Sequence, residues 1–325
     1  MKPRIMAAVI AVYPLVIAPA IALDQNLPPY TTATGIEGQI KSVGSDTLNS
    51  AMELWAKGFG ERYPDVKFVI DGKGSATAPP ALLDGASQFG PMSRPMTTAE
   101  ADAFEKKNGY KVSNLAVAVD ALAVYVHRDN PIRCLSMEQV DQIFSSTHKG
   151  SGGRSINTWG DAGLTGEWAT RPISMYGRND ISGTYEFFSE IALFSGDYKP
   201  EVKQQPGSEA VVHSVAGDKF AIGYSGIGYK TDGVRTVPLS ITFGRKCYDT
   251  TAEATYSGDY PIARFLYIYF NKRPNEQIDP LRGEFIKYVL SRDGQTQVEK
   301  AGFYPITNQQ REKELKRLGL SALAN

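Results

Sequence analysis

The chain has 325 residues, of which 42% are hydrophobic and 22% charged. This is an ordinary globular composition, and the length is enough for two domains with sizeable cores. Lys plus Arg and Asp plus Glu both number 35, so no basic field exists that would attract nucleic acid or an acidic membrane surface. The composition therefore excludes long disordered stretches, and from the balanced charge we expect no nucleic-acid partner.

The first 22 residues have the pattern of a secretory signal peptide. Lys2 and Arg4 precede an apolar run over residues 6–17, and a small-x-small pattern at residues 20–22 predicts cleavage before the next residue. The alternative is a retained transmembrane anchor, which the short length of the run and Pro14 within it disfavour. We therefore expect a periplasmic protein.

Strands and helices alternate in the next hundred residues. Alternation of this kind predicts an α/β fold with a mainly parallel sheet that helices cover on both faces. The polar run at residues 127–131 interrupts the pattern, and we place the first crossover to a second unit there. The expected strands are 39–43, 66–70 and 112–119, with an apolar edge at 88–90, and the expected helices are 46–62, 75–84 and 97–108.

The second unit repeats the alternation, and the chain then returns. Residues 240–262 are rich in Gly, Thr and Pro, which marks the second crossover. We expect two lobes joined by these crossovers, with residues 23–126 plus 240–325 in lobe I and residues 127–239 in lobe II. The expected elements are helices 136–144, 183–194, 207–217, 279–291, 294–300 and 308–318, and strands 172–177, 219–224 and 263–270.

The segment from Arg178 to Thr184 is the most informative motif. It reads Arg-Asn-Asp-Ile-Ser-Gly-Thr between a predicted strand and a predicted helix. The first N–H groups of a helix are unpaired and its dipole is positive there, so hydroxyls at Ser182 and Thr184 add donors to an anion site. Gly183 permits close approach of the backbone, and the Arg178 guanidinium fits a tetrahedral oxyanion. The alternative is an ordinary Ser cap beside a surface Arg.

Three further strand-to-helix turns carry the same residue types. They are Ser45-Asp46-Thr47, the glycine-rich turn that ends in Ser75, and Ser93-Arg94. Each alone could be a plain helix cap or loop, and Thr97 with Glu100 has the spacing of a capping box. In an open α/β sheet, however, the carboxyl ends of the strands line one crevice, so these turns would converge with residues 178–184. Together they predict a tetrahedral-anion site without a metal, because many directed donors offset the desolvation of the ion.

These motifs resemble the periplasmic phosphate-binding proteins of ABC-type phosphate transporters. The most specific mark is Arg-x-Asp-x-Ser-Gly-Thr at residues 178–184, and the resemblance extends from about residue 38 to the C-terminus. It implies a two-lobed periplasmic-binding-protein fold, type II-like, that closes around inorganic phosphate without a cofactor. It also implies an ABC permease in the inner membrane as the partner of a monomer.

The resemblance also implies roles for individual residues. Asp180 would orient Arg178 as its salt-bridge partner. The best-known members carry an Asp after the serine that matches Ser93, and that Asp accepts the proton of the phosphate. This chain has Arg94 there, so we expect Asp46 to be the acceptor and Arg94 a second cation, the alternative being that Asp46 only caps its helix. The expected phosphate-binding residues are Ser45, Asp46, Thr47, Ser75, Ser93, Arg94, Arg178, Ser182, Gly183 and Thr184.

The chain has two cysteines, Cys134 and Cys247. An even count in an oxidising compartment favours a disulfide, which would close a loop of more than a hundred residues. Two buried free thiols are the alternative.

An enzyme would need a metal or an activated nucleophile. His127, His148 and His213 do not form a cluster with metal-ligand spacing, and neither His-Glu-x-x-His nor Cys-x-x-Cys occurs. We therefore expect a binding protein without catalytic or metal-ligating residues. A secreted phosphatase, a phosphate sensor, or a binder of sulfate, arsenate or molybdate are the alternatives that the sequence leaves open.

Overall fold

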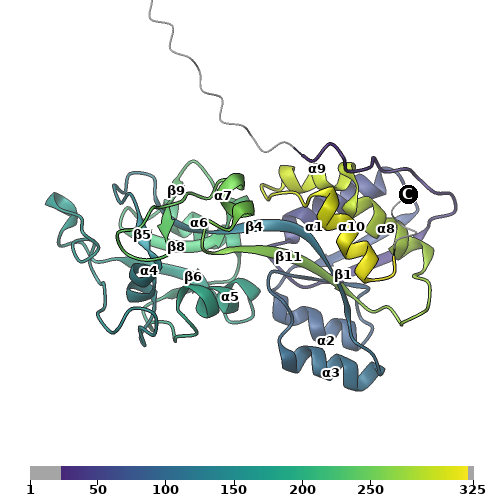
Figure 1. Cartoon of the computed structure of the whole chain (residues 1–325), viewed down its shortest axis with the longest axis horizontal. Helices are drawn as coiled ribbons and strands as arrows, with labels where there is room; N and C mark the ends of the chain where they lie inside the picture. Colours follow the sequence, from purple (N-terminus) through teal and green to yellow (C-terminus); the bar gives the residue numbers. More distant parts are fainter. Residues whose placement is uncertain (1–22, 321–325) are drawn as a thin grey trace, which may run out of the picture.

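The structure is a computed structural model that describes residues 23–320, so the predicted signal peptide at residues 1–22 lies outside the described residues. The chain forms two lobes, and two long strands run from one to the other (Figure 1). The two-lobed α/β architecture predicted from the sequence is confirmed. In this part of the chain, no helix combines the length and the hydropathy that a membrane span requires.

The first elements of lobe I follow the predicted alternation. Strand β1 pairs in parallel with β2 and with β3, as expected for strands joined by helices. The Thr97 and Glu100 capping box at the start of α3 is confirmed, since each side chain accepts a hydrogen bond from the other's backbone N–H. The elements are β1 (Gly38–Val43), α1 (Asn49–Gly60), β2 (Val66–Asp71), η1 (Ser75–Thr77), α2 (Ala78–Leu83), β3 (Phe89–Met92) and α3 (Thr98–Asn108).

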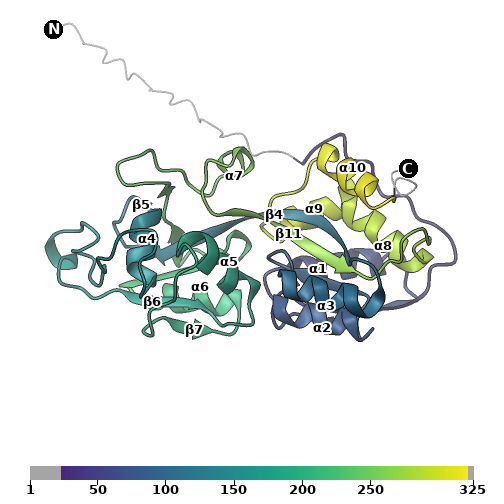
Figure 2. The same ribbon diagram turned by 60° about the horizontal axis from the view of Figure 1, so that its bottom comes forward.

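Strand β4 (Ser113–His127) is one continuous strand and extends well beyond the predicted strand at residues 112–119. It runs antiparallel to β11 (Ala263–Phe270), and the two strands connect the lobes (Figure 2). They are antiparallel because the chain leaves lobe I along one strand and returns along the other. Among the described residues, β4 and β11 thus join both lobes into one nine-stranded sheet with the order β2-β1-β3-β11-β4-β8-β6-β7, and β9 beside β4.

Lobe II contains the predicted helices and longer strands, together with short elements that the sequence does not reveal. Strand β6 pairs in parallel with β7 and β8. Helix α7 (Ala252–Ser257) lies in a segment expected to be a loop, and Thr251 caps it. The elements are β5 (Leu135–Ser136), α4 (Met137–Phe144), η2 (Gly166–Trp168), β6 (Ser174–Arg178), α5 (Gly183–Ala192), β7 (Lys203–Gln205), α6 (Ser208–Ala216), β8 (Ala221–Gly226), η3 (Ile227–Tyr229), β9 (Val234–Thr236) and β10 (Leu239–Ser240).

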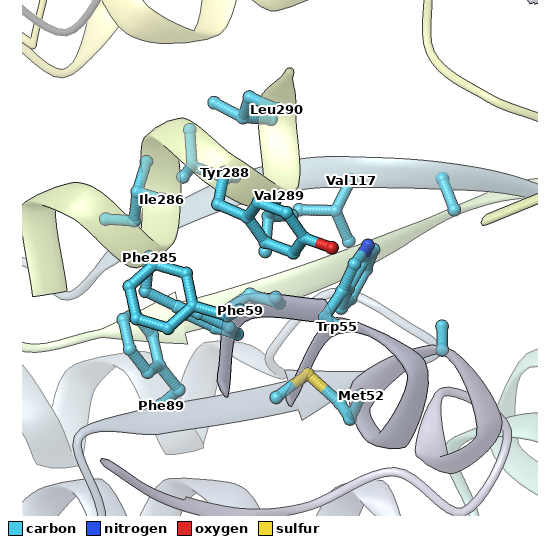
Figure 3. Close-up of a cluster of buried hydrophobic side chains, with 14 of the residues drawn as sticks. Met52, Trp55, Phe59, Phe89, Val117, Phe285, Ile286, Tyr288, Val289 and Leu290 are labelled. Carbon is cyan, nitrogen blue, oxygen red and sulfur yellow. The ribbon is translucent and has the colours of Figure 1, made fainter. Parts of the chain in front are cut away.

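The C-terminal helices α8 (Pro280–Leu290), α9 (Arg292–Lys300) and α10 (Asn308–Arg317) return to lobe I. Helices α8 and α9 pack on α1, and the aromatic side chains between them form the centre of the lobe I core (Figure 3). A second core cluster fills lobe II and includes residues from Ala121 to Ile262. This cluster therefore contains residues from both sides of the predicted lobe boundaries, which lie after residue 126 and before residue 240. The exact boundaries between the lobes remain predictions. The labelled aromatic residues of the lobe I core are Trp55, Phe59, Phe89, Phe285 and Tyr288.

Cys134 and Cys247 form a disulfide, as the cysteine count predicts, with their Cα atoms 6.2 Å apart. The bond lies next to the short pairing of β5 with β10, in which Leu135 faces Leu239. It therefore fixes two segments that are 113 residues apart and share only a two-residue strand pairing.

Candidate functional site

The hydroxyl-bearing turns of both lobes meet between the lobes. Thr47 follows β1, Ser93 follows β3, and Thr184 lies in the first turn of α5 after β6. The Thr47 Oγ1 and Thr184 Oγ1 atoms are 2.9 Å apart, and Ser93 Oγ is 3.5 Å from Thr184 Oγ1. Ser75 Oγ accepts a hydrogen bond of 3.0 Å from the backbone N–H of Ser93. All four side chains are buried, and we call this group, with Ser182, the interlobe seam.

The backbones of the two lobes also touch at the seam. The N–H of Ala76 donates to the carbonyl of Ile181 at 3.2 Å. A Cβ atom at Gly74, whose φ is 148°, would lie 2.4 Å from the same carbonyl, and a Cβ at Gly183 would lie 2.4 Å from Ser75 Oγ. Glycine is therefore required at both positions for this closed arrangement.

One serine of the predicted motifs, Ser182, also caps a helix. Ser182 is the N-cap of α5, and its Oγ accepts a hydrogen bond of 3.2 Å from the N–H of Thr184. Ser45 Oγ accepts from the N–H of Leu48 at 3.4 Å, and α1 begins at Asn49, later than predicted. The cap interpretation of Ser182 is thus correct, and it leaves the hydroxyl of Thr184 facing the other lobe.

Arg178 is completely buried at the end of β6. Its Nη1 donates to Ser208 Oγ at 2.7 Å and lies 2.9 Å from Asp46 Oδ2, while its Nη2 donates to the carbonyl of Pro206 at 3.3 Å. Its Nε is buried and has no hydrogen-bond partner within residues 23–320. Burial lowers the pKa of this guanidinium, and the charge of Asp46 opposes that shift.

The predicted salt bridge between Arg178 and Asp180 is wrong. Asp180 is exposed in the turn after β6, and the carboxylate that pairs with Arg178 is that of Asp46. Because Asp46 belongs to lobe I, the ion pair crosses the seam. Sequence reasoning can identify a salt-bridge partner two residues away, but not one that another lobe brings close in the folded chain. This explains the error.

Asp46 caps a helix, but not its own. Its Oδ2 accepts a hydrogen bond of 2.8 Å from the N–H of Ser208, the first residue of α6 in lobe II. The N-cap of α1, Leu48, makes no side-chain capping hydrogen bond. Tyr229 of η3 donates from its hydroxyl to the Asp46 carbonyl at 2.8 Å and so holds the turn from the lobe II side. The interpretation of Asp46 as a cap of its own helix is therefore wrong, and its role as proton acceptor stays a prediction.

Arg94 is buried at the same seam and is held by two carboxylates. Its Nη1 and Nη2 donate to Glu100 at 2.7 Å and 2.8 Å, and its Nε faces the carboxylate of Glu186. Glu100 lies on α3 in lobe I and Glu186 on α5 in lobe II. Burial raises the pKa of Glu100, but the hydrogen bonds and charge of Arg94, together with the hydrogen bonds from Thr97, leave the pKa below its ordinary value. These contacts neutralise the charge of Arg94. We therefore interpret Arg94 as a residue that holds the two lobes together and not as a cation that binds the ligand.

Two charged residues of the connecting strands were not among the predicted site residues. Arg264 on β11 donates from Nε and Nη2 to Asp120 Oδ2 on β4 at 3.0 Å and 2.9 Å. The Nη2 atom also donates to Thr184 Oγ1 at 2.8 Å, so this pair lies directly at the seam. The sequence signal was available, because each residue is a lone charge within an apolar strand.

The donor set of the seam suits an oxyanion. It consists of hydroxyls, guanidinium groups and the start of α5, all of which donate hydrogen bonds. Nowhere in residues 23–320 do three or more His, Cys, Asp or Glu side chains group in a way that could hold a metal ion. The arrangement can therefore bind a small anion through directed hydrogen bonds from both lobes.

Comparison with known proteins places the chain in a family. The model of the PBP superfamily domain matches residues 29–293. The phosphate-binding protein PstS of Pseudomonas aeruginosa is 50% identical over 299 residues, which cover 92% of this chain and 93% of that protein.

Solved structures agree with that placement. A structure of a putative phosphate ABC transporter substrate-binding protein with bound phosphate from Clostridium perfringens is 25% identical, with a TM-score of 0.70 over 83% of this chain and all of that one. An ABC-type phosphate transport receptor from Vibrio cholerae shares the fold, with a TM-score of 0.64 over 82% of this chain and all of that one, at 21% identity. The chain therefore belongs to the PstS family of phosphate-binding proteins, within the PBP superfamily.

Proposed function

We propose that this protein captures inorganic phosphate between its two lobes and delivers it to an ABC permease in the inner membrane. The observation that carries the proposal is the buried Nε of Arg178, which has no partner in the described part of the chain and belongs to a guanidinium that pairs across the lobes with Asp46, next to Thr47 of the seam. A buried guanidinium donor without a hydrogen-bond partner is unfavourable, and a bound anion would supply the missing acceptor. The names of the relatives, which are phosphate-binding proteins, support phosphate as that anion.

The predicted binding residues divide between the lobes in a way that links binding to closure. Ser45, Asp46, Thr47, Ser75 and Ser93 belong to lobe I, and the segment from Arg178 to Thr184 belongs to lobe II. Only the closed arrangement brings both sets to one ion, so phosphate stabilises the closed state. The strands β4 and β11 are the segments about which the lobes move.

The remaining parts of the proposal concern place and partners. The signal-peptide pattern supports export to the periplasm, where a monomeric binding protein presents its closed lobes to the permease. We propose a transport role without catalysis, because the seam supplies donors for an anion and the phosphate ester bond of a substrate would need further groups to break it.

Calorimetry on refolded, ligand-free mature protein tests the proposal, with phosphate, sulfate, arsenate and molybdate titrated in turn. We expect phosphate and the isosteric arsenate to bind, and Arg178→Ala with Ser182→Ala to abolish binding. Arg171→Ala, which removes an exposed arginine of the same lobe, is the matched control and should bind as the unchanged protein does. Binding of sulfate or molybdate alone would assign the site to another oxyanion, and turnover of a chromogenic phosphate ester would assign it to a phosphatase.

A further inference from the structure

The connecting strands carry a buried ion pair. Asp120 on β4 and Arg264 on β11 face each other in the strand register, and their side chains are 0% and 2% exposed. Removing two charges from water costs several kcal/mol per ion, and hydrophobic residues of similar volume often replace such a pair without loss of stability. Stability alone therefore explains poorly why two charged residues are buried at this position. A role in the adjoining site explains it better.

The contacts of Arg264 leave part of its guanidinium available. Nε and Nη2 donate to Asp120 Oδ2, and Nη2 also donates to Thr184 Oγ1. The Nη1 atom is buried, with no hydrogen-bond partner among the residues that the structure describes. A guanidinium carries five N–H donors, and two of them are on this Nη1. Two buried donors thus lie in the same side chain that touches the seam.

The surroundings of Arg264 connect it to the predicted phosphate residues. Thr184 Oγ1, which accepts its hydrogen bond, also contacts Thr47 and lies near Ser93. The ring of Phe187, one turn further along α5, packs 5.2 Å from the guanidinium carbon. Arg264 therefore contacts the first turns of α5 through Thr184 and Phe187.

Arg178 and Arg264 are both buried and both reach the turns at the seam, because Arg178 pairs with Asp46, next to Thr47, and Arg264 donates to Thr184. Burial is the largest influence that lowers the pKa of Arg264; Asp120 raises it, and the positive charge of Arg178 lowers it further. Two guanidinium groups that repel each other in a dry site, each with an unpaired buried donor, suit a doubly charged anion between them.

We propose that Arg264 is a second guanidinium ligand of the bound anion, supplied by the connecting strands and not by the body of either lobe, and that Asp120 is its positioning residue. The proposal rests on the proposed function, since phosphate is the anion considered. In this proposal Arg264 has the role of second cation, which the sequence analysis predicts for Arg94. The charge of Arg94 is already neutralised by Glu100 and Glu186. Asp120 fixes the guanidinium by accepting from two of its nitrogens, and its Oδ1 accepts from the N–H of Ile227 at 3.0 Å.

The test removes both charges of the pair together. Asp120→Asn with Arg264→Gln leaves no buried charge without a partner, so the variant should fold, and circular dichroism and thermal melting check this. By calorimetry, phosphate should bind about 10- to 150-fold more weakly, the range expected for the loss of a charge-assisted hydrogen bond. Arg62→Gln with Asp293→Asn removes another Arg–Asp pair, at 2.6 Å in lobe I, and should leave the affinity unchanged.

A second variant separates a ligand contact from a role in hinge packing. Arg264→Lys keeps the charge beside Asp120 but not the two-pronged geometry, so its phosphate affinity should lie between those of the unchanged protein and the double variant. Phosphate affinity of the folded double variant equal to that of the unchanged protein would overturn the proposal. So would an equal loss in Arg264→Lys and the double variant, because the charge would then not matter. If the unchanged protein did not bind phosphate at all, the proposed function itself would fail.

Discussion

Thr47 Oγ1 of lobe I and Thr184 Oγ1 of lobe II lie 2.9 Å apart, although 137 residues separate them in the chain. Thr47 lies in the turn between a strand and a helix, and Thr184 lies in the first turn of a helix that follows a strand, so the two lobes meet through similar features of their folds. Both hydroxyls are buried and can either donate or accept. A ligand bound here would exchange this contact for its own hydrogen bonds to both turns, and each lobe would then be held to the other through the ligand.

We expect Asp46→Asn to reduce the preference for phosphate over sulfate by at least about tenfold. A carboxylate accepts the proton of phosphate and its charge repels sulfate, which has no proton, whereas a neutral amide does not repel sulfate and also offers N–H donors to it. The Asn oxygen can still accept from Ser208, so the cap of α6 is retained. Competition calorimetry with the two anions measures the effect, and Asp71→Asn, which alters an exposed pair with Lys73, is the control. Unchanged selectivity would limit Asp46 to its contacts with α6 and Arg178.

Glu186→Gln should weaken the closed state. This carboxylate faces Arg94 across the seam and is partly exposed, so we expect phosphate affinity to fall only about 1.5- to 5-fold. Small-angle X-ray scattering of the ligand-free protein should show a larger radius of gyration than for the unchanged protein. Glu190→Gln changes an exposed residue of the same helix and is the matched control. Identical scattering for the two variants would mean that Arg94 and Glu186 do not hold the lobes together.

Glu100 should make stability depend on pH in a predictable direction. Its folded-state pKa lies below the ordinary 4.5, so its contribution is present above that value and is lost as the pH falls through the folded-state pKa. Gln also fits the capping box, so Glu100→Gln removes mainly the pairing with Arg94.

We therefore expect Glu100→Gln to melt at a lower temperature than the unchanged protein at pH 7, with the difference narrowing below pH about 4. Thermal melts across this range measure it, and Asp102→Asn on the same helix is the control. A difference that is constant with pH would show that the charge of Glu100 does not contribute.

Replacing both Cys134 and Cys247 by Ser should lower the free energy of unfolding by about 2–5 kcal/mol. The bond closes a loop across 113 residues of sequence, and its loss increases the entropy of the unfolded chain. Guanidinium unfolding with and without reductant measures the effect. Phosphate affinity should stay within about twofold, as expected for sites that do not share contacts. A larger loss of affinity would mean that the disulfide also shapes the seam.

The sequence was most informative where structure and chemistry are local. Each predicted strand-to-helix turn is present, because an apolar run followed by Ser, Thr or Gly specifies both the strand end and the helix start. The capping box at Thr97 and the disulfide were likewise predictable from spacing and count. Short elements such as β5 and β10 were not, because two residues carry no periodicity.

The contacts missed by sequence reasoning are those that depend on how the lobes sit against each other. Arg178 pairs with Asp46 and not with the nearby Asp180, and Arg94 binds carboxylates from both lobes. Asp120 was not predicted to belong to the site, because its partner, Arg264, is 144 residues away. In each case the sequence shows the charged residue, but it does not show which distant residue neutralises the charge.

The hydrogen bond from the N–H of Ala76 to the carbonyl of Ile181 has a practical consequence. It joins two main chains, so every protein molecule carries it without any label or engineered side chain. Separation of the lobes breaks this bond and exposes the amide of Ala76 to solvent, where its hydrogen exchanges with deuterium. The exchange rate of this single amide can therefore serve as a native gauge of how often the molecule opens, read in solution and at any concentration of anion.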